Sequence, residues 1–94
     1  MQNWRTKKLK GLMKAILSIK NETEALNFFR DLCTIDELEE MAQRWEIAQL
    51  LNKKQSYRAI AEKVGVSTTT VARIAQWLDH GEGGYKATLD KIRK

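Results

Sequence analysis

Residues 56–78, SYRAIAEKVGVSTTTVARIAQWL, constrain the fold of this chain more than any other stretch. They predict two short helices, one over about 56–64 and one that starts after Ser67, joined by a turn at Gly65. Glycine reaches the positive φ that a sharp turn requires without a Cβ penalty. The Ser67 hydroxyl can accept a hydrogen bond from an unpaired amide in the first helical turn. The stretch therefore predicts a helix-turn-helix.

Apolar residues recur at helical spacing on one face of each predicted helix. Ala61 is small, which suits the point where two helices that cross at a steep angle approach each other. We expect the apolar residues to form the core of the motif. They are Ile60, Ala61 and Val64 on the first helix, Val71, Ile74 and Leu78 on the second, and Val66 between them.

The second helix begins with polar side chains on its outer side. In a DNA-binding helix-turn-helix this end of the second helix lies in the major groove, where side chains contact base edges and phosphates. An ordinary helical hairpin inside an all-α domain is the alternative. The outer residues are Thr68, Thr69, Ala72, Arg73 and Gln76, and they follow directly on Ser67.

The net charge of +5 is unevenly distributed along the chain. Residues 1–20 carry six basic residues and no acidic one, and residues 34–52 have a net charge of −4. Residues 53–78 have a net charge of +4, because Lys53, Lys54, Arg58, Lys63 and Arg73 are opposed by Glu62 alone. This distribution favours a polyanion such as double-stranded DNA as the partner, with Lys53 and Lys54 among the contacts. An anionic membrane surface is a weaker alternative for the N-terminal helix.

The composition predicts a single all-α domain over residues 1–94, because the chain is short, lacks proline and shows no long alternation of apolar and polar residues. We divide it into N-terminal helices and a dimerisation core over 1–52, a reading head over 53–79, and a glycine loop with a final helix over 80–94. No stretch is long and apolar enough for a membrane span, and the N-terminus does not resemble a signal peptide. The single cysteine, Cys33, fits a reducing cytoplasm and a buried structural thiol.

Two helices are predicted before residue 33, over about 4–20 and 23–32. The first carries a five-residue apolar stripe at helical spacing. Phe28 and Phe29 of the second are expected in the core. Because an exposed stripe of this size is rarely tolerated by a monomer, we predict a homodimer. The dimerisation residues would be Leu9, Leu12, Met13, Ile16, Leu17, Phe28 and Phe29.

Thr34 and Glu37 have the spacing of a capping box and predict the start of a third helix that runs to about Leu51. This helix should be the central one. Its predicted inner stripe is Leu38, Met41, Ala42, Trp45, Ala48 and Leu51. A loop with three glycines follows over 80–84, and a final helix is predicted over about 85–93.

No arrangement of residues indicates an enzyme. The chain has one histidine, His80, and no recognisable nucleophile–base pair, metal cluster or glycine-rich phosphate loop. We therefore expect no catalysis, no cofactor and no metal. The acidic residues of the third helix are interpreted as a solvated face. The main alternative function is a helical protein–protein module whose head region docks an acidic partner.

Four short stretches resemble a known family: LCTIDE at 32–37, RWEI at 44–47, SYR at 56–58 with Ala61 and Gly65, and GGYK at 83–86. The chain resembles the Trp repressor family over essentially its whole length, and most closely the YerC/YecD-like branch. The resemblance implies a six-helix, all-α, intertwined homodimer. It also implies a bacterial, cytoplasmic, repressor-like transcription regulator that binds DNA through its helix-turn-helix.

The resemblance also implies roles for individual residues. It adds Ser56, Tyr57, Arg58 and Thr70 to the residues expected near DNA, beside Thr68, Thr69 and Arg73. Arg44 and Arg73 match the arginines that flank the indole in tryptophan-binding members, and Thr34 matches a threonine of that pocket.

Two departures from the family's tryptophan site affect the expected co-repressor. The glycine and the serine of that site are Ile74 and Trp77 here. We therefore expect the chain's own side chains to fill the pocket, an ordered reading head, and DNA binding without tryptophan. The alternative is that Trp77 packs against the last helix and leaves the pocket open.

Overall fold

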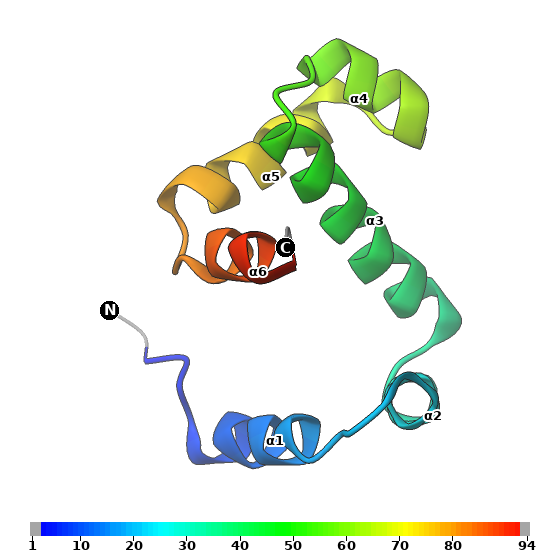
Figure 1. Ribbon diagram of the computed structural model, residues 1–94, viewed down its shortest axis with the longest axis vertical. Coiled ribbons are helices and arrows are strands. Elements are labelled where there is room, and N and C mark those ends of the chain that lie inside the picture. Colours follow the sequence, from blue (N-terminus) through cyan, green and yellow to red (C-terminus); the bar gives the residue numbers. More distant parts are fainter. Residues whose placement is uncertain (1–2, 93–94) are drawn as a thin grey trace. The chain divides into compact units, whose positions relative to one another are not determined.

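The computed structural model describes residues 3–92, which form helices and no strand (Figure 1). The all-α prediction is confirmed. The six helices of the described residues are α1 (Lys7–Leu17), α2 (Glu22–Leu32), α3 (Ile35–Asn52), α4 (Tyr57–Val64), α5 (Thr68–His80) and α6 (Gly84–Ile92). The last helix was expected to reach Arg93, which lies outside the described residues.

The chain divides into two compact units, one ending at Leu38 and the other beginning at Glu39. The first unit holds α1, α2 and the first turn of α3. The second holds the rest of α3 together with α4, α5 and α6. The finer division into residues 1–52, 53–79 and 80–94 stays a prediction.

Helix α1 is shorter than the predicted 4–20 because polar side chains bond to the backbone at both of its ends. The Thr6 hydroxyl accepts a hydrogen bond from the Leu9 amide at 3.1 Å and caps the N-terminus. At the other end, Ser18 Oγ donates to the Ala15 carbonyl at 2.6 Å, and α1 ends at Leu17. Such local bonds compete with the next helical turn.

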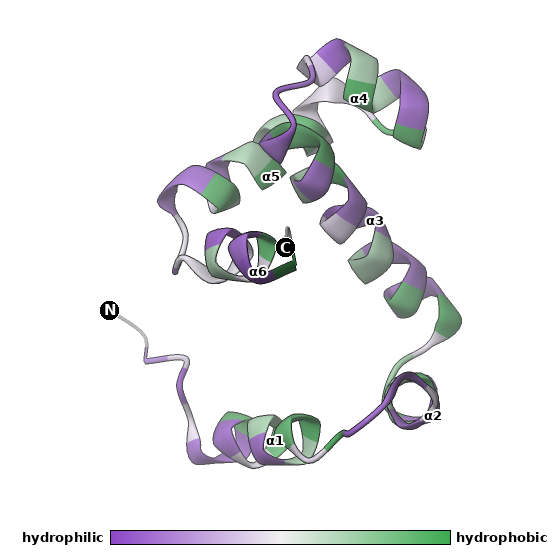
Figure 2. Cartoon of the chain, viewed as in Figure 1, coloured by the Kyte–Doolittle hydropathy of each residue, from purple (hydrophilic) through white to green (hydrophobic). Residues whose placement is uncertain are grey.

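The first unit contains amphipathic helices without a buried core of their own. Neither α1 nor α2 has a buried residue, and Leu17 is 84% exposed. Phe28 and Phe29 pack edge to face with ring centroids 5.5 Å apart, but both are only half-buried. They are therefore not fully buried within the single chain, and their place in a core shared with a second copy stays a prediction. Figure 2 shows the apolar positions along α1 in green between purple basic ones.

The N-terminus of α3 has the predicted capping box. The Thr34 amide donates to Glu37 Oε1 at 2.8 Å, and the Glu37 amide donates to Thr34 Oγ1 at 3.1 Å. This reciprocal pair satisfies two backbone donors that have no partner inside the helix.

The hydrophobic core of the second unit lies where α3, α4 and α5 meet. The predicted inner stripe of α3 is only partly right: Ala48 is buried, whereas Met41 is 41% exposed. Ile47 and Leu50 are buried instead, because the C-terminal half of α3 is apolar on more than one side and packs against α4 and α5 in this cluster. The buried cluster comprises Ile47, Ala48, Leu50, Ile60, Ala61, Val71 and Ile74.

Helix α6 completes the second unit. Leu89 is 7% exposed, and the Tyr85 ring stacks on Trp45 of α3 with centroids 6.2 Å apart and planes inclined by 27°. The contact with α5 and this stacking tie α6 to the helices of the core.

Candidate nucleic-acid interface

The turn between α4 and α5 has the predicted geometry. Gly65 ends α4 in the left-handed conformation, with φ 84°, and its amide donates to the Ala61 carbonyl at 2.9 Å. Ser67 then caps α5, because its hydroxyl oxygen accepts from the Thr70 amide at 3.1 Å. Gly65 is therefore matched to a backbone position that side chains rarely adopt.

The inner face of α5 is buried in the hydrophobic core of the second unit. Val71 is fully buried and Ile74 is 1% exposed, and both pack in the cluster with Ile60 and Ala61 of α4. Ala75, which the sequence analysis did not single out, is also buried at 6%. The predicted Leu78 is half-buried, as are Val64 and Val66 at the edge of the core.

The opposite face of α5 points to solvent. Thr69, Arg73 and Gln76 are four and then three residues apart, so they share one side of the helix. All three are exposed, as are Thr68 and Ala72. A row of short hydroxyls, one guanidinium and one amide is thus presented by a helix whose other side is anchored in the core.

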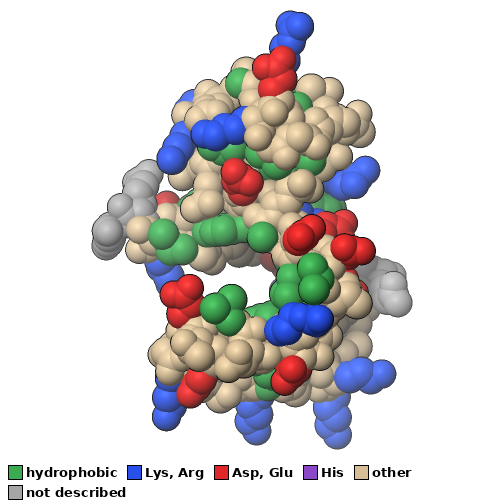
Figure 3. All heavy atoms as spheres, turned by 90° about the vertical axis from the view of Figure 1, so that its right-hand side faces the viewer, with side chains coloured by type: hydrophobic (Ala, Val, Ile, Leu, Met, Phe, Trp, Pro, Cys, Tyr) green, Lys and Arg blue, Asp and Glu red, His purple; other side chains and the backbone are tan. Residues whose placement is uncertain are grey.

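The start of α4, the first helix of the α4–α5 pair, also presents polar residues to solvent. Tyr57 is 46% exposed, and Ser56 caps α4 by accepting from the Ala59 amide at 3.1 Å. The Ser56 hydroxyl proton remains available to a phosphate oxygen, because in this bond the hydroxyl acts as acceptor. Figure 3 shows basic side chains projecting from the part of the chain that carries α4 and α5.

The structure places the residues predicted to contact DNA at the surface with one qualification. Thr70 is half-buried, and its hydroxyl lies 3.1 Å from Ser67 Oγ, so it belongs to the cap of α5. The exposed residues are Lys53, Lys54, Ser56, Tyr57, Arg58, Ser67, Thr68, Thr69, Arg73 and Gln76.

A small cavity beside α5 brings together two of the three residues predicted to bind a ligand. It has a volume of about 160 Å³ and is lined by residues of α3 and α5, including Arg44, Arg73 and Ile74, and by Val66 of the turn. Thr34 is not among its lining residues. It belongs to the first unit, where it caps α3.

Two side chains of the protein itself, those of Glu40 and Trp77, contact the Arg44 guanidinium. Glu40 Oε2 lies 3.3 Å from Arg44 Nη2, and the Trp77 ring centroid lies 5.3 Å from Arg44 Cζ. Glu40 also lines the cavity, and the sequence analysis did not assign it to this site. The spacing of four residues between an acid and a base on one helix was the signal that could have found the pair.

Trp77 is shared between two cavities. Its indole lines the small cavity and also a larger apolar groove of about 700 Å³, which Trp45, Tyr85 and Ile92 line as well. Trp77 is 39% exposed, so it closes one side of the small cavity without being enclosed.

Residues 3–92 hold neither a metal-ligand cluster nor a membrane-spanning helix. No group of three or more potential metal ligands gathers there, and no helix in that range is both long and apolar enough to span a membrane.

The helices and the core together define an all-α protein with a Trp repressor-like fold. The family model described as "Trp repressor protein" matches residues 7–93 of this chain. The chain belongs to the Trp repressor family, and the predicted resemblance is confirmed.

Individual relatives agree with this assignment. The uncharacterized protein YerC of Bacillus subtilis (strain 168) is 39% identical over 90 residues, covering 96% of this chain and 86% of that protein. A TrpR-like protein from Eubacterium eligens ATCC 27750 has a similar crystal structure, with a TM-score of 0.89, 40% identity and coverage of 94% and 91% of the two chains. A crystal structure from Staphylococcus aureus, provisionally described as a Trp repressor, gives a TM-score of 0.88, 34% identity and coverage of 95% and 89%.

Proposed function

We propose that this protein is a sequence-specific, DNA-binding transcription regulator of the bacterial cytoplasm that acts as a homodimer and performs no catalysis. The observation that carries the proposal is the exposed outer face of α5, where Thr69, Arg73 and Gln76 stand on a helix anchored by Val71 and Ile74. Membership of the Trp repressor family supports it.

The chemistry of this face suits the major groove. An arginine can pair with guanine, a glutamine with adenine, and short hydroxyls with either base edges or phosphates. The surrounding charge suits a duplex, because residues 53–78 have a net charge of +4. Lys53, Lys54 and Arg58 would neutralise phosphates and provide affinity that does not depend on sequence.

Exposed apolar surfaces in both units support the homodimer. Met13 of α1 is 42% exposed and Leu26 of α2 is 63% exposed, while Ile92 at the groove of the second unit is 60% exposed. Surfaces of this kind are costly to leave in water and mark interaction sites. We propose that a second copy of the chain covers them and that each copy offers one reading head to a two-fold operator.

The departures at the cavity beside α5 favour regulation without tryptophan. Glu40 Oε2 lies 3.3 Å from Arg44 Nη2, so the carboxylate of a ligand would have to displace the Glu40 carboxylate from this guanidinium. The buried Ile74 side chain also takes up space that the ring of a ligand would need. We propose that tryptophan is not a co-repressor of this protein.

The proposal is tested by selection of bound duplexes from a random pool, followed by gel shifts at several salt concentrations. We expect enrichment of a two-fold symmetric site and an affinity that falls steeply with salt, since counterions are released from the neutralised phosphates. Retention of no duplex at low salt would refute the proposal and favour a module that docks an acidic protein.

A further inference from the structure

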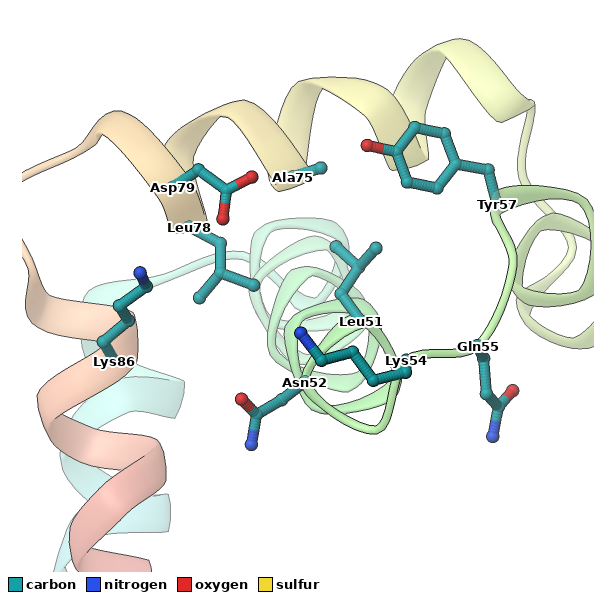
Figure 4. A pocket seen from close by; sticks show the side chains of 9 residues that line it. All are labelled: Leu51, Asn52, Lys54, Gln55, Tyr57, Ala75, Leu78, Asp79 and Lys86. Atoms are coloured by element: carbon teal, nitrogen blue, oxygen red, sulfur yellow. The ribbon is translucent and has the colours of Figure 1, made fainter.

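The second unit contains a polar cavity on the side of α5 that faces the end of α3 and the start of α6 (Figure 4). Its volume is about 480 Å³. Leu51, Ala75 and Leu78 provide its apolar part. Neither the proposed base contacts nor the cavity of Arg44 and Arg73 accounts for it.

Two lysines from separate elements line this cavity. Lys54 lies in the loop after α3 and Lys86 lies in α6, and the folding of the second unit brings both side chains to one site (Figure 4). Within residues 3–92 neither ammonium group takes part in an ion pair. Asp79 of α5 also lines the cavity, so the charged groups sum to one positive charge.

The backbone of Lys54 is held in an unusual conformation. Lys54 has φ 66° and is the single residue other than glycine with positive φ in the described part of the chain. Its amide donates to the Leu51 carbonyl at 2.9 Å, and the Gln55 amide donates to the Leu50 carbonyl at 3.3 Å. Glycine or asparagine adopts this helix-ending conformation at lower cost, so a lysine here points to a function for its side chain.

Polar neutral groups complete the site. Asn52, Gln55 and Tyr57 are also lining residues of this cavity, and each carries a side chain that can both donate and accept hydrogen bonds. An inorganic anion bound in this cavity would place its negative charge beside the Asp79 carboxylate, which is unfavourable. A ligand with hydroxyl groups would give that carboxylate hydrogen-bond donors.

We propose that this cavity binds a small phosphate monoester whose carbon framework carries hydroxyl groups, which is the chemistry of a sugar phosphate. Lys54 and Lys86 bind the phosphate as point charges, and Asp79 accepts hydrogen bonds from the hydroxyls. The apolar part, including Leu78, contacts the carbon framework. Lys54 and Tyr57 also belong to the proposed duplex contacts, so under that proposed function the ligand and the duplex compete for them.

The test is a calorimetric titration of the full chain with fructose 6-phosphate in the absence of DNA. We expect saturable binding to one site per chain and an affinity roughly tenfold higher than that for inorganic phosphate, since the hydroxyls add contacts. Fructose alone should not bind. Because no duplex is present, failure of the proposed DNA binding would leave this result unaffected.

Matched variants assign the binding to the cavity. Lys86→Gln should lower the affinity for fructose 6-phosphate roughly tenfold by removing a charge-assisted hydrogen bond. Lys91→Gln, on the same helix and outside the lining residues, is the control and should leave it unchanged. Asp79→Asn should reduce the ratio of the fructose 6-phosphate affinity to the inorganic phosphate affinity. Circular dichroism checks that each variant keeps its helices.

Three outcomes would overturn the proposal: no saturable binding, equal losses in Lys86→Gln and Lys91→Gln, or equal affinity for fructose 6-phosphate and inorganic phosphate. In the last case the duplex is tested as the phosphate source. A salt dependence of duplex binding that is shallower by about one unit in Lys86→Gln would assign the site to a backbone phosphate.

Discussion

The guanidinium of Arg44 lies over the indole of Trp77, with Cζ 5.3 Å from the ring centroid, and so joins α3 to α5. A cation over an exposed indole contributes about 0.5–1 kcal/mol, and an exposed ion pair such as Arg44–Glu40 contributes about as much or less. The burial of Ile74 adds a larger apolar term. Side chains of the protein itself therefore hold α5 against α3.

We expect no tryptophan dependence. Calorimetry with millimolar tryptophan should show no saturable heat, and duplex affinity should be the same with and without the amino acid. The physical reason is that Ile74 is 1% exposed and Arg44 is engaged by Glu40 and Trp77. Saturable binding, or a duplex affinity that rises with tryptophan, would refute this prediction.

Ile74→Gly combined with Trp77→Ser should loosen the reading head. Removal of a buried isoleucine costs about 2–5 kcal/mol, and glycine inside a helix adds about 1 kcal/mol. The free energy of unfolding, measured with urea, should fall accordingly. Gln76→Ser, at an exposed position of the same helix, is the control and should change it by less than about 1 kcal/mol.

Two glycines should respond oppositely to alanine. A methyl group added at Gly65 or at Gly11 would meet no atom within 4 Å apart from the adjacent residues and the backbone of its own helix, so packing does not distinguish the two positions. Gly65→Ala should destabilise the protein by about 1–2 kcal/mol because the residue has φ 84°. Gly11→Ala, inside α1, should stabilise it by about 0.5–1 kcal/mol. Shifts of the same sign in thermal unfolding would contradict the backbone explanation.

Arg58→Ala and Thr69→Ala should affect duplex binding differently. Arg58 is proposed to contact a phosphate, so its loss should weaken all duplexes about equally and make the salt dependence shallower by about one unit. Thr69 is proposed to contact a base edge, so its loss should change the preferred sequence. Gel shifts on the selected site and on scrambled duplexes measure both effects. Equal effects of both changes on every duplex would exclude Thr69 as a reader of sequence.

Leu17→Gln should weaken dimerisation if a second copy covers α1. Leu17 is 84% exposed in the single chain, so its replacement removes few contacts within that chain. We expect the dissociation constant measured by sedimentation to rise by roughly tenfold or more, because a buried leucine contributes about 1.5–3 kcal/mol. Lys7→Gln, on the opposite side of the same helix from the apolar stripe, is the control and should have little effect. A wild-type chain that sediments as a monomer at micromolar concentration would refute the dimer itself.

Local features could be predicted from the sequence because they depend on neighbouring residues. The capping box of Thr34 and Glu37, the Ser67 cap and the left-handed Gly65 each involve groups within three or four residues of one another. The buried Ile60, Val71 and Ile74 followed from helical periodicity, because one face of a short amphipathic helix must be covered.

The rest was decided by tertiary contacts that periodicity does not encode. The C-terminal half of α3 is apolar on more than one side, so only the positions of α4 and α5 decided that Ile47 and Leu50 are buried. The meeting of Arg44 with Trp77, and of Lys54 with Lys86 at one cavity, joins residues from different helices and loops. Sequence alone determined the local caps and turns at the ends of several helices. The tertiary structure decided which of those helices meet, because packing depends on how their side chains fit in space and not on their separation along the chain.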